Sequence, residues 1–272
     1  MGTLYLVATP IGNLEDLSIR ALRILREASL IAAEDTRQTK KLLTHFDIHT
    51  PLTSYFEHNK LSKLDAILAR LNEGDVALVS DAGTPALNDP GYELVRAALK
   101  VGHRVSPVPG PASPIAALTA SGLPTDTFLY LGYLPRKSTE RKKAIRQVAS
   151  LPYTLIFLET PHRLLESLED LEGILGSRQI ALARELTKLH EEIWRGRLDE
   201  ARRYFNSPRG EFVLVIEGYT KEGTEKWGED KLLTAIIRGI KAGETPSALA
   251  ARLADESGWP RREIYKLTTQ QD

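Results

Sequence analysis

Residues 4–13 have the sequence LYLVATPIGN, an apolar run that ends in a loop containing proline and glycine. A short apolar run bounded by such residues is typical of a buried strand. The pattern returns at residues 76–85, which read VALVSDAGTP. Because residues with helical spacing lie between these two runs, we predict an α/β fold with a largely parallel sheet in the first part of the chain.

The rest of the chain contains further strand and helix patterns. Strands are predicted at 30–33, 104–108, 128–131, 155–158, 180–183 and 212–216, and helices near 17–25, 36–43, 61–71, 94–99, 114–120, 161–172 and 198–205. From Glu229 onward, three helix-like segments follow without a strand signal, as in a helix-turn-helix unit or a simple helical cap. We expect an N-terminal α/β domain (1–120), a C-terminal α/β domain (121–225) and a helical module (226–272).

The composition excludes several classes of chemistry. The 272 residues contain 36 Lys and Arg, 36 Asp and Glu, and no Cys. Disulfides, thiol nucleophiles and thiolate zinc sites are therefore excluded, and the histidines lack metal-ligand spacing, so no metal is expected. Because the net charge is zero, a polyanionic partner has to be bound by local patches. The main candidate patch is residues 136–146, RKSTERKKAIR, although such a run is more often a solvated helix face.

The sequence also bears on localisation. No apolar run reaches the roughly 18–20 residues of a membrane span. The first residues lack the basic segment of a signal peptide. We expect a soluble cytoplasmic protein without a membrane partner.

Four polar loops each follow a predicted strand: residues 9–13, 34–37, 80–85 and 109–113. In an open α/β sheet, ligands bind outside the carboxyl ends of the strands, so these loops are expected to converge on one site. An ordinary βα turn would explain any one of them alone. Loops at four successive strand ends favour a binding site.

These loops, in this order, resemble the small-subunit ribosomal RNA methyltransferase I group of the tetrapyrrole methylase superfamily. The segments that carry the resemblance are 5–14, 33–37, 54–55 with 57–59, 80–85, 107–111, 159–163 and 183–188. Phe56 departs from the pattern, where a polar residue or His would be expected. The resemblance implies two α/β domains of the class III methyltransferase type with a small C-terminal helical module. It implies S-adenosylmethionine as cofactor, methylation of a cytidine ribose 2′-hydroxyl in the decoding region of small-subunit ribosomal RNA, and a homodimer. The substrate would be the RNA or the assembled 30S subunit.

The resemblance also assigns site residues. The donor site should fall on Ile11, Thr84, Leu87, Ser113, Leu158, Ala183 and Gly210. A ribose hydroxyl is a poor nucleophile, so a base is expected, and the catalytic candidates are Glu34, Asp81 and Lys188, with Asp35 and Glu185 nearby. The RNA-binding candidates are Arg37, Tyr55, His58, Asn59, Arg136, Lys137, Arg141, Lys142, Lys143 and Arg163. Tyr55 and Phe56 are candidates for stacking on an exposed base, unless one of the pair is buried.

Two other functions compete with this one. A methylase acting on a small tetrapyrrole would need neither the basic segment at 136–146 nor the helical tail. A ligand-sensing DNA-binding regulator would need several phosphate contacts from its recognition helix, and the tail carries little net charge.

Overall fold

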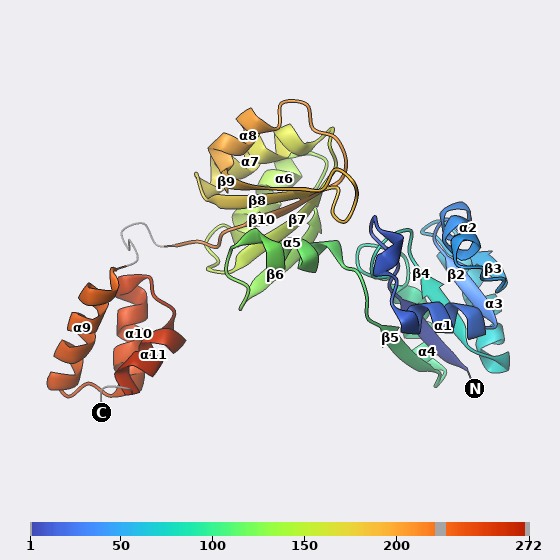
Figure 1. Cartoon of the computed structure of the whole chain (residues 1–272), viewed down its shortest axis with the longest axis horizontal. Helices are drawn as coiled ribbons and strands as arrows, with labels where there is room; N and C mark the ends of the chain where they lie inside the picture. The colour runs from blue at the N-terminus through green and yellow to red at the C-terminus, as the bar shows by residue number, and fades with distance from the viewer. Residues whose placement is uncertain (1, 221–226, 270–272) are drawn as a thin grey trace. The chain divides into compact units, whose positions relative to one another are not determined.

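The computed structural model describes residues 2–220 and 227–269, and its elements are shown in Figure 1. They form two units, one containing residues 1–149 and 153–217 and the other residues 150–152 and 218–272. The first unit contains two five-stranded sheets. The second contains the helical tail.

The first sheet has the strand order β3-β2-β4-β1-β5, and all its described pairs are parallel. Its strands are β1 (Thr3–Val7), β2 (Leu30–Ala33), β3 (Leu52–Ser54), β4 (Val76–Val79) and β5 (Arg104–Val108). The connecting helices are α1 (Ile19–Glu27), α2 (Thr36–His45), α3 (Lys60–Glu73) and α4 (Tyr92–Lys100), with a short 3-10 turn at η1 (Leu14–Asp16). The predicted parallel α/β arrangement is confirmed.

Helices cover both faces of this sheet. Because side chains alternate along a strand, Ile31 and Ala33 of β2 pack with α1 and α2, whereas Ala32 packs with α3 and α4. Helix α2 begins at Thr36, since Asp35 accepts a hydrogen bond from the Arg37 backbone N–H and is the N-cap. The chain therefore leaves β2 and enters α2 through the short acidic pair Glu34–Asp35.

The second sheet has the order β6-β7-β10-β8-β9. Its strands are β6 (Phe128–Tyr133), β7 (Thr154–Glu159), β8 (Gln179–Arg184), β9 (Glu192–Arg197) and β10 (Phe212–Ile216). Only the β6–β7 pair is parallel, and the other described pairs are antiparallel. Strand β9 was not predicted, because its sequence EIWRGR is half polar and lies on the edge of the sheet.

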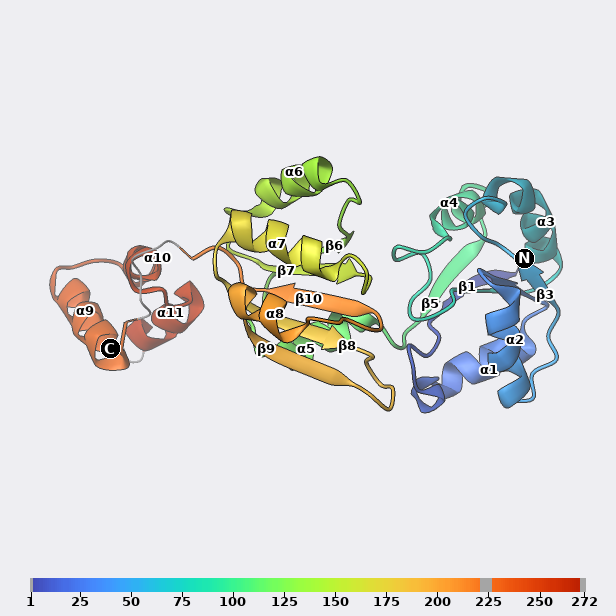
Figure 2. The same ribbon diagram turned by 90° about the horizontal axis from the view of Figure 1, so that it is seen from above.

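Two groups of helices pack on opposite faces of the second sheet (Figure 2). Helix α5 (Ser113–Ser121) packs on the face that carries Ile156, Ala183 and Val215. Helices α6 (Ser138–Val148), α7 (Leu164–Leu175) and α8 (Leu198–Tyr204) form a layer in which α7 contacts both neighbours. By its packing, α5 belongs with the second sheet, so the chain passes between sheets before residue 113, ahead of the boundary expected after residue 120.

The tail forms three helices, as predicted: α9 (Glu229–Lys241), α10 (Pro246–Ser257) and α11 (Arg261–Thr269). They have a core of their own, centred on Leu232, Ile236, Leu249, Leu253 and Ile264. Residues 226 and 270–272 of the predicted module lie outside the described part. Within that part, no helix has the length and apolar character needed to cross a membrane.

Candidate active site

A pocket lies at the carboxyl ends of the strands of the first sheet and is closed by loops of the second. Its first wall consists of Ile11, Glu34, Asp81, Ala82, Gly83, Thr84, Leu87, Asn88, Asp89, Ala112, Ser113 and Pro114. Its second wall consists of Tyr130, Tyr133, Leu158, Ala183, Glu185, Leu186, Lys188, Glu211, Phe212 and Val213. All four loops singled out in the sequence contribute to the first wall, because parallel strands end at the same edge of a sheet.

Backbone hydrogen bonds connect the loops of the first wall. The N–H of Thr9 donates to the carbonyl of Gly83 at 2.9 Å, and the N–H of Gly83 returns the bond at 3.0 Å. The hydroxyl of Thr84 donates to the carbonyl of Pro111 at 3.1 Å. Three loops that are far apart in the sequence are therefore held in one rigid rim.

Two glycines allow the 185–188 loop of the second wall to lie close to neighbouring backbone. A Cβ atom on Gly12 would lie 2.5 Å from Cγ of Lys188 and 2.7 Å from the backbone oxygen of Leu186. A Cβ on Gly210 would lie 2.5 Å from Oε1 of Glu185, and Gly210 has a φ of +80°. Since such contacts exclude side chains, only glycine fits at these two positions.

The structure brings together the residues expected to bind the methyl donor. Six of the seven line this pocket: Ile11, Thr84, Leu87, Ser113, Leu158 and Ala183. Gly210 immediately precedes the lining residue Glu211. The individual contacts to the donor stay predictions, but one pocket contains nearly the whole set.

The pocket is rich in carboxylates. Asp81 accepts a hydrogen bond from the backbone N–H of Asp35 at 2.9 Å, and the backbone N–H of Asp81 donates to Glu34 at 3.4 Å. Burial raises the pKa of Glu34, and the charge of Asp89 raises it further. Burial raises the pKa of Asp89 to about 6. The pocket therefore concentrates negative charge in a partly desolvated place.

The three catalytic candidates line the same pocket but differ in their partners. Nζ of Lys188 donates to Glu185 at 2.9 Å, so these two side chains form an ion pair. Glu34 and Asp81 face each other across the ends of β2 and β4. Asp89, Glu211, Tyr130 and Tyr133 also line the pocket but were missed by the sequence analysis. The run LNDPG at residues 87–91 reads as an ordinary turn, and no local signal places its Asp in a pocket.

The predicted RNA-stacking residues separate into a buried and an exposed aromatic. Tyr55 is 0% exposed in the core beneath α3 and α4, so the prediction that it stacks on a base is wrong. Phe56, by contrast, is exposed. The side chain of Asn59 accepts from the Phe56 N–H and donates to Ser54, so it supports the turn that enters α3. His58 is exposed beside this turn.

Arg37 lies away from the main pocket. It lines a second, open concavity together with Lys40 and His49, and its guanidinium is 2.7 Å from Asp35. Its contact with RNA stays a prediction.

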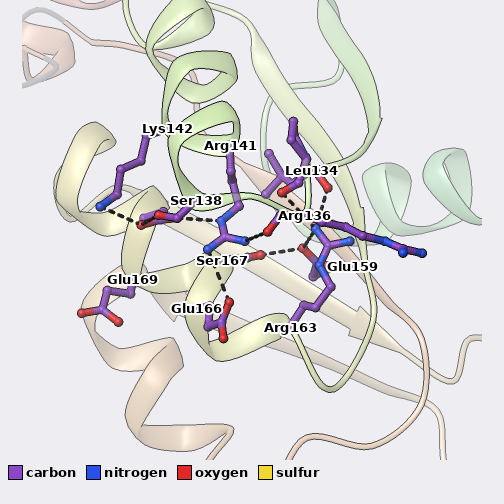
Figure 3. A network of polar contacts seen from close by, with 12 residues as sticks. Leu134, Arg136, Ser138, Arg141, Lys142, Glu159, Arg163, Glu166, Ser167 and Glu169 are labelled. Carbon is purple, nitrogen blue, oxygen red and sulfur yellow. Dashed lines mark hydrogen bonds and ion pairs between the residues drawn. The ribbon is translucent and has the colours of Figure 1, made fainter.

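The basic segment 136–146 includes the N-cap Lys137 and most of α6, and its cations have different environments (Figure 3). Arg141 is 2% exposed, and its Nε donates to Asp170 of α7 at 2.6 Å. Lys142 is 3.3 Å from the same carboxylate. Arg136, Lys137 and Lys143 are exposed. The prediction that Arg141 contacts RNA is wrong, because its guanidinium is buried and joins two helices.

Arg163 has a comparable internal role. Its guanidinium donates to the backbone carbonyls of Leu134 at 2.5 Å and Pro135 at 3.3 Å, and it lies 3.3 Å from Glu159. Glu159 is buried and accepts a hydrogen bond from Ser167 at 2.5 Å. Arg163 therefore fixes the backbone just before the exposed Arg136 and Lys137, rather than presenting its own charge to solvent.

Comparison with known proteins gives the class to which this fold and pocket belong. Residues 3–202 match the family model described as Tetrapyrrole (Corrin/Porphyrin) Methylases. The fold is similar to that of uroporphyrin-III C-methyl transferase from Thermus thermophilus, whose structure was solved in complex with S-adenyl homocysteine. That structure has a TM-score of 0.56 and 23% identity, and the match covers 79% of this chain and 97% of that one.

Relatives that match nearly the whole chain identify the family within this class. The chain is 48% identical to the ribosomal RNA small subunit methyltransferase I of Halalkalibacterium halodurans, over 99% of this chain and 96% of the relative. It is 47% identical to the enzyme of the same name from Escherichia coli O157:H7, over 99% of this chain and 96% of the relative. The chain belongs to the ribosomal RNA small subunit methyltransferase I family. It is therefore an S-adenosylmethionine-dependent methyltransferase, as the sequence predicted.

The residues of the pocket fit this cofactor. S-adenosylmethionine combines an apolar adenine ring with a positively charged sulfonium. Ile11, Leu87, Leu158 and Leu186 supply apolar surface, and the carboxylates of the first wall supply negative charge. Among the described residues, no group of His, Asp and Glu is arranged to hold a metal ion.

Proposed function

We propose that this protein transfers a methyl group to the ribose 2′-hydroxyl of a cytidine in the decoding region of small-subunit ribosomal RNA. The observation that carries the proposal is one pocket lined by both apolar side chains and carboxylates, at the predicted donor site, in a chain of this family. When bound, the cofactor supplies an activated methyl group, so the protein has mainly to align the reacting atoms and exclude water.

The residues of the pocket divide this task. The rim connected through Thr9, Gly83 and Thr84 provides rigid backbone for positioning a ligand. The carboxylates attract the cationic donor more than its product, because the charge on sulfur is lost in the transfer, and this favours exchange of product for new donor. A carboxylate can also accept the proton that the ribose hydroxyl loses.

The proposal is tested by incubation with methyl-labelled donor and 30S subunits, naked small-subunit RNA or a tetrapyrrole. The expected result is label in the RNA, released by nucleoside digestion as 2′-O-methylcytidine. Label in the base rather than the ribose would refute the proposed position. Label in the tetrapyrrole alone would refute the RNA substrate and support the small-molecule alternative.

The exposed cations of α6 are proposed as RNA contacts. Changing Lys137 and Lys143 together to Glu is expected to weaken RNA binding at least tenfold. The slope of log affinity against log salt should fall by about 0.7 for each phosphate that is no longer neutralised, because fewer counterions are released. Filter binding at several salt concentrations measures both quantities.

A matched control changes the same number of charges elsewhere. Lys100 and Arg104 are exposed cations around the α4–β5 connection, and Lys100→Glu with Arg104→Glu should leave the slope unchanged. Calorimetry with the methyl donor should give equal affinity for both double variants. An unchanged RNA affinity in the α6 variant would remove this helix from the proposed interface.

Two further properties are proposed from family membership. The first is a homodimer, which light scattering after size exclusion tests directly, with a mass of one chain as the contrary result. The second is action in the cytoplasm, where small ribosomal subunits are assembled, and cell fractionation tests it.

A further inference from the structure

Asp89 lies on a strained turn in the lining of the pocket. Ala86 and Asn88 have φ values of 66° and 64°, in the left-handed region that costs a residue with a side chain about 1 kcal/mol or more. Asn adopts this region more readily than most residues, but alanine does not, so the surrounding structure has to impose the conformation of Ala86. Such strain is retained where the turn holds a functional group in place.

The second sheet holds this turn in place. Gly132 of β6 has a φ of 65° and lies at a bulge in the pairing of β6 with β7. A Cβ atom on Gly132 would be only 2.4 Å from the amide nitrogen of Asn88. The Asn88 side chain thus occupies the space that Gly132 leaves open. Asp89, the next residue, is thereby directed into the pocket.

The groups around Asp89 come from both walls. They are Ser80 and Asp81 after β4, Glu34 after β2, Tyr130 and Tyr133 of β6, and Glu211 before β10. Burial raises the pKa of Asp89 to about 6, the charges of Asp81 and Glu211 add to the rise, and a hydrogen bond with Ser80 opposes it. A carboxyl group in this range is a stronger base than an ordinary aspartate, yet it is ionised at neutral pH.

We propose that Asp89 is the general base that takes the proton from the attacking ribose hydroxyl. This assignment rests on the proposed methylation of RNA ribose. In the step, the ribose oxygen forms a bond to the methyl carbon, and the carbon–sulfur bond breaks with its electron pair going to sulfur. The hydroxyl proton passes to a carboxylate oxygen of Asp89, and the sulfur loses its positive charge. No other reactant is needed to balance the step.

The other candidates are less suited to this role. Lys188 is held in an ion pair with Glu185. Asp81 accepts the N–H of Asp35 and so supports the entry into α2. Glu34 accepts the N–H of Asp81, which connects the ends of β2 and β4. Asp89, by contrast, lines the pocket and directly follows Ala86 and Asn88, the two positions of its turn with positive φ.

The test compares wild type with Asp89→Asn in single-turnover methylation of 30S subunits between pH 5 and pH 9. Because a base acts only when deprotonated, the wild-type rate should rise with pH and level off above an inflection at or below about 6. The bound cationic donor would lower the pH of this inflection, because positive charge favours the ionised carboxylate. In Asp89→Asn the plateau rate should fall by about 10²–10⁴-fold and the inflection should disappear. RNA affinity by filter binding should stay within about threefold of wild type, which also confirms that the variant is folded. Donor affinity by calorimetry should fall by much less than the rate, because the other carboxylates of the pocket remain.

Glu211→Gln provides a matched change in the same pocket. Removing the Glu211 charge should move the wild-type inflection to lower pH, because this charge raises the pKa of Asp89. The proposal is overturned if Asp89→Asn keeps the inflection and a rate within about threefold of wild type. It is also overturned if the loss of rate equals a loss of donor affinity, since Asp89 would then only position the donor. If wild type fails to methylate RNA ribose, the proposed function fails and this assignment falls with it.

Discussion

Replacing Arg141 with methionine is expected to lower the free energy of unfolding by about 3–5 kcal/mol. Methionine keeps much of the apolar stem but removes the guanidinium, which leaves the carboxylate of Asp170 buried at 6% exposure with Lys142 and Ser138 as its remaining partners. Breaking one side of a buried ion pair is costly because the remaining charge stays desolvated. Urea denaturation followed by circular dichroism measures the change.

Two matched variants separate charge from packing. In Arg141→Met combined with Asp170→Leu, both charges are removed, so most of the missing stability should return. Lys142→Met removes a half-exposed partner of the same carboxylate, and it should cost about 1 kcal/mol or less. A decrease below about 1 kcal/mol in Arg141→Met would contradict the view that this pair joins α6 to α7.

The same cluster gives stability a pH dependence. Burial alone would raise the pKa of Asp170, but hydrogen bonds from Arg141, Lys142 and Ser138 outweigh it and lower the pKa below the usual 3.8. Because the folded pKa lies below the unfolded one, the stabilisation is present above the unfolded value and is lost as pH falls through the folded value. The stability difference between wild type and Arg141→Met, which keeps Asp170 but lacks its main partner, should therefore shrink below about pH 4.

Gly12→Val is expected to weaken donor binding at least tenfold, or about 1.4 kcal/mol. The new Cβ would lie 2.7 Å from the backbone oxygen of Leu186 and 2.8 Å from the hydroxyl oxygen of Thr187. A rotamer change cannot relieve contact with the backbone, so the 185–188 loop has to move away from the pocket it lines. Calorimetric titration with S-adenosylmethionine measures the weakening.

Gly173→Val is the control for this substitution. Gly173 lies within α7, and a Cβ there meets no atom within 4 Å. Donor affinity should be unchanged in this variant, and thermal unfolding should report the folding of both proteins. Wild-type donor affinity in Gly12→Val would show that the 185–188 loop can retreat without disturbing the donor site.

The RNA-binding predictions show where sequence reasoning about charge fails. The run 136–146 contains cations of similar appearance, but α6 turns Arg141 toward α7 and leaves Lys137 and Lys143 in solvent. Helical periodicity indicates which residues share a face of the helix. It does not indicate what packs against that face, and here the partner of Arg141 is Asp170, 29 residues away. Arg163 was likewise misjudged, since its partners are carbonyls of a preceding strand end.

The sequence by itself determined the alternating strands and helices, the three-helix tail and the grouping of four loops in one place. These features follow from local periodicity and from the rule that parallel strands end at one edge, so short segments are enough to predict them. The order and spacing of the loops also carried the resemblance that led to the family. Tertiary structure alone decided that Tyr55 and Arg141 are buried, that α5 packs on the second sheet, and that Asp89 enters the pocket. Each of these depends on contacts between elements distant in the chain, because burial and electrostatic neighbours are properties of the packed molecule and not of any local stretch.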